Sequence, residues 1–400
     1  MSQFIESENE IFKAQKALLT FLGCWTKESS SFAWMTYLRG YFNATMNSIC
    51  VLAQYTFAIK HRDNLILVLD CMCPATTMGV TAFKIFMLVW KTKELNGIFD
   101  TIKDAFKREV AEKGVSVRKW IPLKGFYSTI FLMSTTGTVA FSFFAFPIIF
   151  NIQSSIKGVD FVPETMFKSV WPFNHLVTPY MEIIYLYMTY LLFVTQFGIS
   201  GIDNLFMDIY LHVAALMNIL AEDLNSMEKR FLTNYKLDSV SKFTKEQNTK
   251  FYHEIKRLVK KHQFYLEFCK RVEIFFSEII LVHFVSSSFI LCMSLMDLLL
   301  APGLIKITYI SYIIAATTQV FIYSYAGGQL EEACNNIEVA TYGISWYRMD
   351  SRNKKLLMKL LMRSQRTVQI KAPFVTASLA TFEAIVQAAR SYVTLLYTFI

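Results

Sequence analysis

The chain has 400 residues, of which 54% are hydrophobic and 16% aromatic, while only 18% are charged. Soluble domains average about 45–50% apolar and about 25% charged residues, so this composition argues against an ordinary soluble protein. Residues 125–156 contain no Asp, Glu, Lys or Arg, and a run of this length needs lipid as its solvent. We therefore expect an all-α polytopic membrane protein. The net charge of +9 is spread over the polar segments between apolar runs, so no nucleic-acid partner is invoked.

The N-terminal segment, residues 1–32, lacks the basic start and the small-residue cleavage site of a secretory signal, and we expect it to remain in the cytoplasm. Seven uncharged or nearly uncharged runs follow, each close to the ~20 residues that a helix needs to cross the ~30 Å hydrocarbon core. These predicted spans are 33–58, 65–90, 125–151, 180–202, 276–299, 307–328 and 374–399. The second holds Asp70 and Lys84, and the seventh is the most polar.

The positions of Lys and Arg predict the orientation of these spans. Of the 40 basic residues, 32 lie in segments 1–32, 91–124, 203–275 and 329–373, and 5 lie in the segments on the opposite side. Cytoplasmic segments carry the excess of Lys and Arg, so the N-terminus is expected inside and the C-terminus outside. G-protein-coupled receptors have the opposite polarity, and the external loop 152–179 has no cysteine for the disulfide that is usual in that class.

This topology divides the chain into six parts. They are a cytoplasmic segment (1–32), spans one to four (33–202), a cytosolic helical extension (203–275), spans five and six (276–328), a second cytosolic segment (329–373) and the seventh span (374–400).

Helical periodicity continues beyond the membrane in segment 203–275. Mostly apolar residues recur at spacings of three and four, which places them on one helical face. They are Leu205, Ile209, Val213, Leu216 and Leu220, and then Phe251, Ile255, Leu258, His262, Tyr265 and Phe268. The second stretch feeds into the fifth span, which predicts a helix from about 251 to 299, roughly 70 Å long. With the amphipathic segment 351–366 it predicts a cytosolic anchor bundle, formed within one chain or between subunits; helices lying on acidic lipid are the alternative.

The C-terminal part of the chain carries ordered motifs. YSYAGGQLEEACNNIEVATYGISWY (323–347) is followed by RSQRTVQIKAPFVTASLATFEAIVQAARSYVTLLYTF (363–399). In order and spacing these motifs resemble the last two spans of the insect odorant receptors. The matching residues are Tyr325, Gly327, Gly328, Trp346, Ser364, Gln365, Arg366, Phe382, Ser391, Tyr392, Leu395 and Leu396. Insect gustatory receptors share the architecture, but their final span more often ends in a TYxxxxxQ-type motif.

The resemblance implies an odour-specific subunit of a ligand-gated, non-selective cation channel. Four subunits, including the shared odorant co-receptor, would surround a pore lined by the seventh helix. The expected location is the plasma membrane of olfactory sensory neuron dendrites. A gustatory receptor channel is the alternative within the same superfamily, and a secondary transporter is a third possibility, although no internal repeat with broken helices is evident.

The seventh span carries Glu383, Gln387 and Arg390, which are costly in lipid and usually face water or protein. A pore wall accounts for them. Tyr392, Leu395 and Phe399 share one helical face, with Thr398 beside them, and the resemblance places the pore at the same positions. Leu395 and Phe399 are therefore expected to form an apolar gate, and Thr398 to offer a hydroxyl to hydrated ions. Packing of these side chains against neighbouring helices is the alternative.

The resemblance also implies a ligand pocket in the outer half of the bundle. Volatile ligands are small and mostly apolar, so aromatic and thioether contacts should dominate, with few hydrogen bonds. The candidate contacts are Cys73, Thr77, Phe141, Phe144, Ala145, Tyr185, Met188, Thr189, Phe289, Met293 and Tyr312. Ordinary helix packing is the alternative role for each of them.

No catalytic motif or metal-ligand spacing is present in the sequence. The six histidines are scattered, and neither HExxH nor a phosphate-binding loop occurs. Cys71-x-Cys73 lacks a second cysteine pair, so the seven cysteines are expected to be single thiols. The sequence therefore predicts a receptor that is not an enzyme and needs no cofactor or metal.

Overall fold

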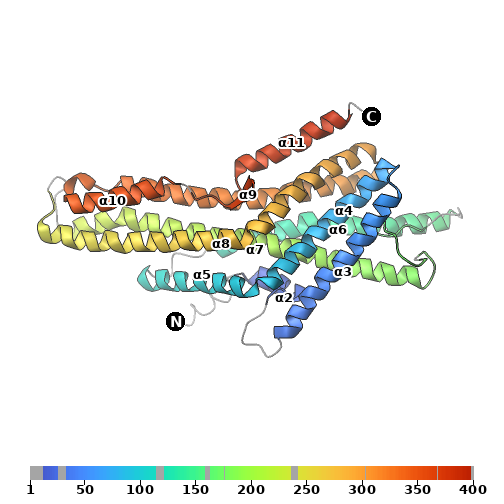
Figure 1. The fold of residues 1–400 in the computed structure, drawn as a ribbon, viewed down its shortest axis with the longest axis horizontal. Coiled ribbons are helices and arrows are strands. Elements are labelled where there is room, and N and C mark those ends of the chain that lie inside the picture. The colour runs from blue at the N-terminus through green and yellow to red at the C-terminus, as the bar shows by residue number, and fades with distance from the viewer. Residues whose placement is uncertain are drawn as a thin grey trace.

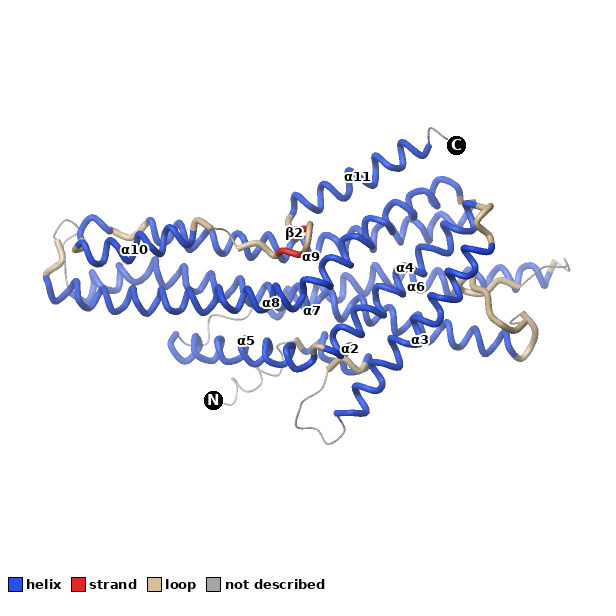
Figure 2. Tube along the Cα trace, viewed as in Figure 1, coloured by secondary structure: helices blue, strands red, loops and turns tan. Residues whose placement is uncertain are grey.

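The computed structural model describes residues 12–25, 33–113, 121–157, 163–174, 176–235, 242–301, 303–366 and 368–397. These residues form helices joined by turns, loops and one two-stranded hairpin, which confirms the predicted all-α class (Figure 1, Figure 2). The elements are α2 (Lys13–Leu22), α3 (Ala33–Lys60), α4 (Leu65–Trp90), α5 (Thr92–Lys113), α6 (Ile121–Ile156), α7 (Tyr180–Tyr235), α8 (Lys245–Leu300), η2 (Gly303–Ile305), α9 (Lys306–Tyr342), η3 (Trp346–Arg348), α10 (Ser351–Ser364), β1 (Lys371–Ala372), β2 (Val375–Thr376) and α11 (Leu379–Tyr397).

In the described part of the chain, five helices are long and apolar enough to cross a membrane: α4, α6, α7, α8 and α9. They contain the second to sixth predicted spans. The first and seventh predicted spans correspond to α3 and α11, whose more polar sequences leave them outside this set. The chain is a polytopic membrane protein, as its composition indicates.

Two helices are far longer than a bilayer is thick. α7 and α8 each have 56 residues, which corresponds to roughly 84 Å of helix. The start of α8 is fixed by a capping box, in which Thr244 Oγ1 accepts from the N–H of Gln247 and Gln247 Oε1 accepts from the N–H of Thr244. The predicted continuous helix is thus confirmed, although it begins about two turns before residue 251.

The excess length of α7 and α8 packs with the end of α9 and with α10 into an elongated bundle at one end of the molecule (Figure 1). The predicted apolar row on α8 is fully turned inward: Phe251, Ile255, Leu258 and Phe268 are at most 1% exposed. This bundle is the predicted anchor. Its apolar stripe is covered by helices of the same chain, so a lipid surface is not needed to bury it.

Polar groups inside the anchor are paired or neutral. Tyr265 donates to Glu109 Oε1 at 2.8 Å, and Lys261 bridges Glu109 and Asp223, which ties α5 and α7 to α8. Burial, with a smaller effect of the Arg363 cation, lowers the pKa of His262 to about 4. His262 is therefore neutral at pH 7 and compatible with an apolar interior.

The last helix is placed by a short hairpin. Strands β1 and β2 pair antiparallel, with Lys371 opposite Thr376 and Ala372 opposite Val375. From this hairpin α11 rises along α8 and α9 but stands apart from the other helices (Figure 1). Much of its surface is therefore not covered by its own chain.

Candidate functional site

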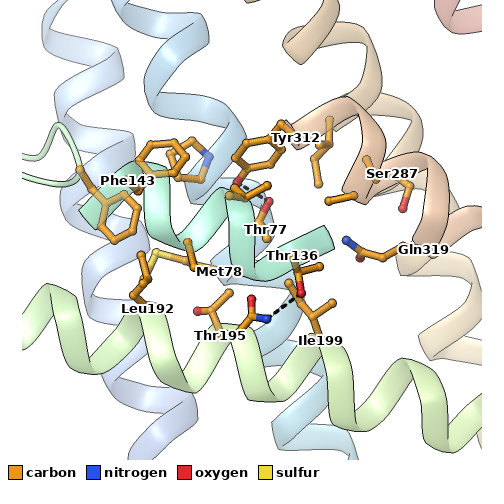
Figure 3. Close-up of a pocket in the computed structure, with 18 residues that line it drawn as sticks. Thr77, Met78, Thr136, Phe143, Leu192, Thr195, Ile199, Ser287, Tyr312 and Gln319 are labelled. Carbon is orange, nitrogen blue, oxygen red and sulfur yellow. Dashed lines mark hydrogen bonds between the residues drawn. The ribbon is translucent and has the colours of Figure 1, made fainter. Parts of the chain in front are cut away.

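A cavity lies among α4, α6, α7, α8 and α9 in the membrane-spanning part of the bundle (Figure 3). Its side chains surround about 630 Å³ of empty space, part of which is open to the surroundings. It is lined by Pro74, Thr77, Met78, Thr136, Val139, Ala140, Phe143, Phe167, Leu192, Thr195, Gln196, Ile199, Ser287, Ile290, Tyr312, Ala315, Ala316 and Gln319. None of these side chains is charged.

Three alanine side chains and one proline leave this space between the helices. Ala140 of α6 and Ala315 and Ala316 of α9 contribute only a methyl group each, where larger side chains would fill the gap. Pro74 lies inside α4 and removes one backbone N–H from the helical hydrogen-bond ladder. The cavity therefore follows from the local sequence of three helices.

Aromatic rings form one end of the cavity, and we refer to Phe143, Phe167 and Tyr312 as the aromatic end. The Phe143 ring centroid lies 5.5 Å from that of Phe167 and 5.9 Å from that of Tyr312, the latter pair in an edge-on arrangement. The Tyr312 hydroxyl and the Thr77 hydroxyl are hydrogen-bonded at 3.0 Å. These rings offer an apolar surface whose polar atoms are already satisfied.

The loop between α6 and α7 closes the aromatic end. Phe167 of this loop lines the cavity, and the next residue, Lys168, pairs with Asp70 at 2.5 Å. Asp70 also accepts a hydrogen bond from Tyr309, and the thiol of Cys71 donates to the Lys168 carbonyl oxygen. The loop is thus fastened to α4 beside the cavity, and Asp70 links this contact to α9 through Tyr309.

Uncharged polar side chains form the opposite end, which we call the polar end: Thr136, Thr195, Gln196, Ser287 and Gln319. Figure 3 shows Phe143 and Gln319 on opposite sides of the cavity. The Gln196 amide donates to Thr136 Oγ1 at 2.8 Å and to the Met133 carbonyl oxygen at 3.0 Å. Thr195 donates to Asn47 Oδ1 at 3.2 Å.

A buried charged cluster lies one helical turn beyond the polar end. Lys84 Nζ is 2.5 Å from Asp203 Oδ1, and Tyr323 donates to the same oxygen at 2.8 Å. Lys84 Nζ is also 3.3 Å from His283 Nδ1, and the His283 and Tyr323 rings stack with centroids 4.0 Å apart. All four residues are at most 1% exposed. The cluster joins four helices, α4, α7, α8 and α9, below the cavity.

Two predicted ligand contacts, Thr77 and Tyr312, line this cavity. Cys73 is buried one turn from Thr77, with its sulfur 3.6 Å from Ser294 Oγ. Met188 is also buried, in a cluster that Tyr185 packs against. The predicted contacts outside the lining are Cys73, Phe141, Phe144, Ala145, Tyr185, Met188, Thr189, Phe289 and Met293.

On α6 the predicted contacts Phe141 and Phe144 do not face this cavity. Phe141 and Phe144 are 70% and 39% exposed on the outside of the bundle, while Phe143 between them lines the cavity. Successive helical residues point about 100° apart, so neighbouring phenylalanines face different directions. Gln196 and Gln319 were also missed. Amides inside apolar spans were the available signal, because polar groups at membrane depth usually face the interior.

The predicted pore residues lie partly within the described range. Tyr392 and Leu395 of α11 are 58% and 55% exposed, on a surface that the chain itself does not cover, whereas Thr398 and Phe399 lie outside the described residues. Glu383, Gln387 and Arg390 are exposed as well. The Gln387 amide donates to Glu383 Oε1 at 3.0 Å, so the partner of Glu383 is Gln387, one turn away.

The seven cysteines are free thiols, of which six are buried and Cys292 is half-buried. Within the described ranges, no group of three or more His, Cys, Asp or Glu side chains is arranged to hold a metal ion.

Comparison with known proteins decides the family. The sequence profile of the 7tm odorant receptor family matches residues 64–390. This chain belongs to the odorant receptor family. Odorant receptor 22c of Drosophila melanogaster is 27% identical over 92% of the chain and 90% of its own length, and Odorant receptor 24a of the same fly is 25% identical over 97% and 96%. The resemblance based on the C-terminal motifs is confirmed, and with receptors as relatives the chain is not an enzyme.

Solved structures share the fold. The olfactory receptor OR5 from Machilis hrabei in complex with eugenol has a TM-score of 0.74, with 97% of this chain and 98% of that chain covered, although the sequences are only 12% identical. A second structure of the same receptor also has a TM-score of 0.74, with 96% of each chain covered. The architecture of this odorant receptor is therefore that of an insect olfactory receptor.

Proposed function

We propose that this odorant receptor binds a small volatile molecule in the cavity and, together with co-receptor subunits, forms an odorant-gated, non-selective cation channel. The observation that carries the proposal is an uncharged, partly aromatic cavity within the helical bundle of an odorant receptor. The olfactory receptor OR5 from Machilis hrabei, which shares the fold, has been solved in complex with the small molecule eugenol, and an uncharged, partly aromatic lining suits a small, mostly apolar ligand. The proposed site of action is the plasma membrane of olfactory sensory neuron dendrites.

The coupling of the cavity to a gate is supported by the continuity of the helices. α7, α8 and α9 each run from the cavity into the anchor, and α11 packs on α8 and α9. A ligand that alters the packing at the cavity changes helices that also hold the last helix. α11 is the proposed pore wall, because its polar residues and its Tyr392 and Leu395 face are not buried by the rest of the chain.

Phe143→Ala should raise the odorant concentration for half-maximal current by about ten- to a hundredfold. The ring contributes apolar contact worth about 1.5–3 kcal/mol when it is fully buried against a ligand. The measurement is voltage clamp in oocytes that express the chain with and without the co-receptor, across an odour panel. Currents should require the co-receptor.

Phe141→Ala is the matched control, because Phe141 lies two residues away and faces outward. It should leave the response unchanged. A shift with Phe141→Ala but not with Phe143→Ala would mean that the ligand binds elsewhere.

For the pore, Leu395→Ala is expected to raise the current without odorant or to change ion permeability, since removal of an apolar constriction favours wetting. Val393→Ala is the control at nearly the same depth, about 160° around the helix. Reversal potentials under ion substitution measure the effect. If Leu395→Ala and Val393→Ala conduct alike, this face of α11 does not line the pore.

A further inference from the structure

Ser287 differs from the neighbouring serines Ser286, Ser288 and Ser294 of α8. Ser286, Ser288 and Ser294 each donate a hydrogen bond to a carbonyl oxygen of the preceding turn, at 2.7, 2.9 and 2.7 Å. This bond is the usual way in which a helical serine satisfies its hydroxyl in an apolar environment. Among the residues that the structure describes, the Ser287 hydroxyl has no hydrogen-bond partner, although the residue is only 3% exposed and lines the cavity.

Gln319 lacks side-chain hydrogen bonds of the kind that hold Gln196. The Gln196 amide is held by Thr136 and Met133 across the gap between α6 and α7. The Gln319 side chain has no hydrogen-bond partner within the described ranges, and Figure 3 shows its amide pointing into the cavity. Ser287 is buried and Gln319 is half-buried. Because an unpaired polar group away from water costs free energy, both side chains favour a molecule that supplies the missing hydrogen bonds.

The two free groups lie together, away from the aromatic end. Gln319 follows Tyr312 by seven residues on α9, which corresponds to about 10 Å along the helix axis. Ser287 lies on the adjacent α8, and Figure 3 shows it on the same side of the cavity as Gln319. An elongated ligand can therefore rest its apolar part against Phe143 and Tyr312 while a polar atom reaches Gln319 and Ser287.

The polar end of the cavity does not favour a ligand with a charged group. The cavity lining contains no charged side chain, and the buried charges Lys84 and Asp203 beyond the polar end are paired with each other. A carboxylate or an ammonium group would lose its hydration without gaining a counter-ion, which is strongly unfavourable.

Resting on the proposed function, we infer that Gln319 and Ser287 determine specificity. They select a small, uncharged, mostly apolar molecule that carries one hydrogen-bonding oxygen, a hydroxyl or a carbonyl, at one end. Both groups can donate and accept, so both oxygen types fit. A site with unpaired polar groups rejects an analogue that lacks the matching atom.

The test measures binding to the purified full-length chain by ligand-induced thermal stabilisation, with octanol, octanone and nonane as probes of equal heavy-atom number. Wild type should bind the two oxygenated probes at least about tenfold more tightly than nonane. Gln319→Leu should lose most of this preference by weakening the oxygenated probes while nonane binds as before. Ser287→Ala, a smaller change, should reduce the preference in the same direction.

Thr317→Val is the matched control, because Thr317 lies on α9 but outside the cavity lining. It should keep the wild-type preference. Equal binding of the three probes to wild type, or an unchanged preference in both Gln319→Leu and Ser287→Ala, would overturn the inference. Since binding is read without current, a chain that binds selectively but never conducts refutes the proposed channel and leaves the inference standing. If Gln319→Leu does not fold, Ser287→Ala alone decides.

Discussion

Replacement of Asp203 by alanine should destabilise the protein by about 3–5 kcal/mol, because it leaves the Lys84 ammonium buried without a counter-charge. The same substitution removes the acceptor of the Tyr323 hydroxyl. Since the cluster joins α4, α7, α8 and α9, the loss reaches most of the bundle. Thermal unfolding of the purified protein in detergent, together with its surface expression, measures the effect.

Glu278→Ala is a control that removes an ion pair at an exposed position. Glu278 is paired with Lys91 at 2.8 Å, but its side chain is 52% exposed, and pairs of this kind contribute at most about 1 kcal/mol. The double variant Lys84→Met, Asp203→Leu should recover most of the stability, since a buried pair can be replaced by apolar side chains. If Asp203→Ala unfolds at the same temperature as Glu278→Ala, then Asp203 does not compensate the charge of Lys84.

The pairing of Lys84 with Asp203 illustrates what the sequence alone could not show. Lys84 stood out as a charge within a predicted span, but Asp203 was assigned to the first position of a cytosolic extension. The two residues are 119 positions apart in the chain, and only the packing of α4 on α7 brings them together. The pattern of apolar runs in the sequence indicates how deep in the membrane a charged residue lies. Which residue it pairs with depends on tertiary contacts.

Helical periodicity predicts the buried face of a helix more reliably where the opposite face contacts water. The α8 row from Phe251 to Phe268 was predicted from spacing alone and is buried in the anchor. In the spans, by contrast, both lipid and protein interior are apolar, so a phenylalanine gives no sign of which it faces. Phe141 and Phe143 could not be told apart for this reason, and the structure alone shows that Phe143 lines the cavity, whereas Thr77 and Tyr312 are predicted contacts that also line it.

The second large effect is expected at Gly327, one of the residues that carry the family resemblance. Gly327 lies in α9 where the helix meets the backbone just before α11. A Cβ atom at Gly327 would overlap the carbonyl oxygen of Ala377 and lie 2.8 Å from its carbonyl carbon. Ala377 is itself held by a 2.9 Å hydrogen bond from its N–H to the Ile370 carbonyl oxygen. Since helix and hairpin backbone are both fixed here, Gly327→Ala must displace α11 from α9.

Gly327→Ala is therefore expected to cost about 1–3 kcal/mol through overpacking and to abolish or strongly reduce odorant-evoked current. Gly328→Ala is a matched control in the next position, because its Cβ atom would make an ordinary 3.7 Å contact with Leu379. Alanine is also preferred to glycine in a helix by about 1 kcal/mol, so Gly328→Ala should be neutral or stabilising. Thermal unfolding and voltage clamp of both variants separate the cases. Equal behaviour of the two would show that the close approach of α9 to Ala377 does not hold α11 in place.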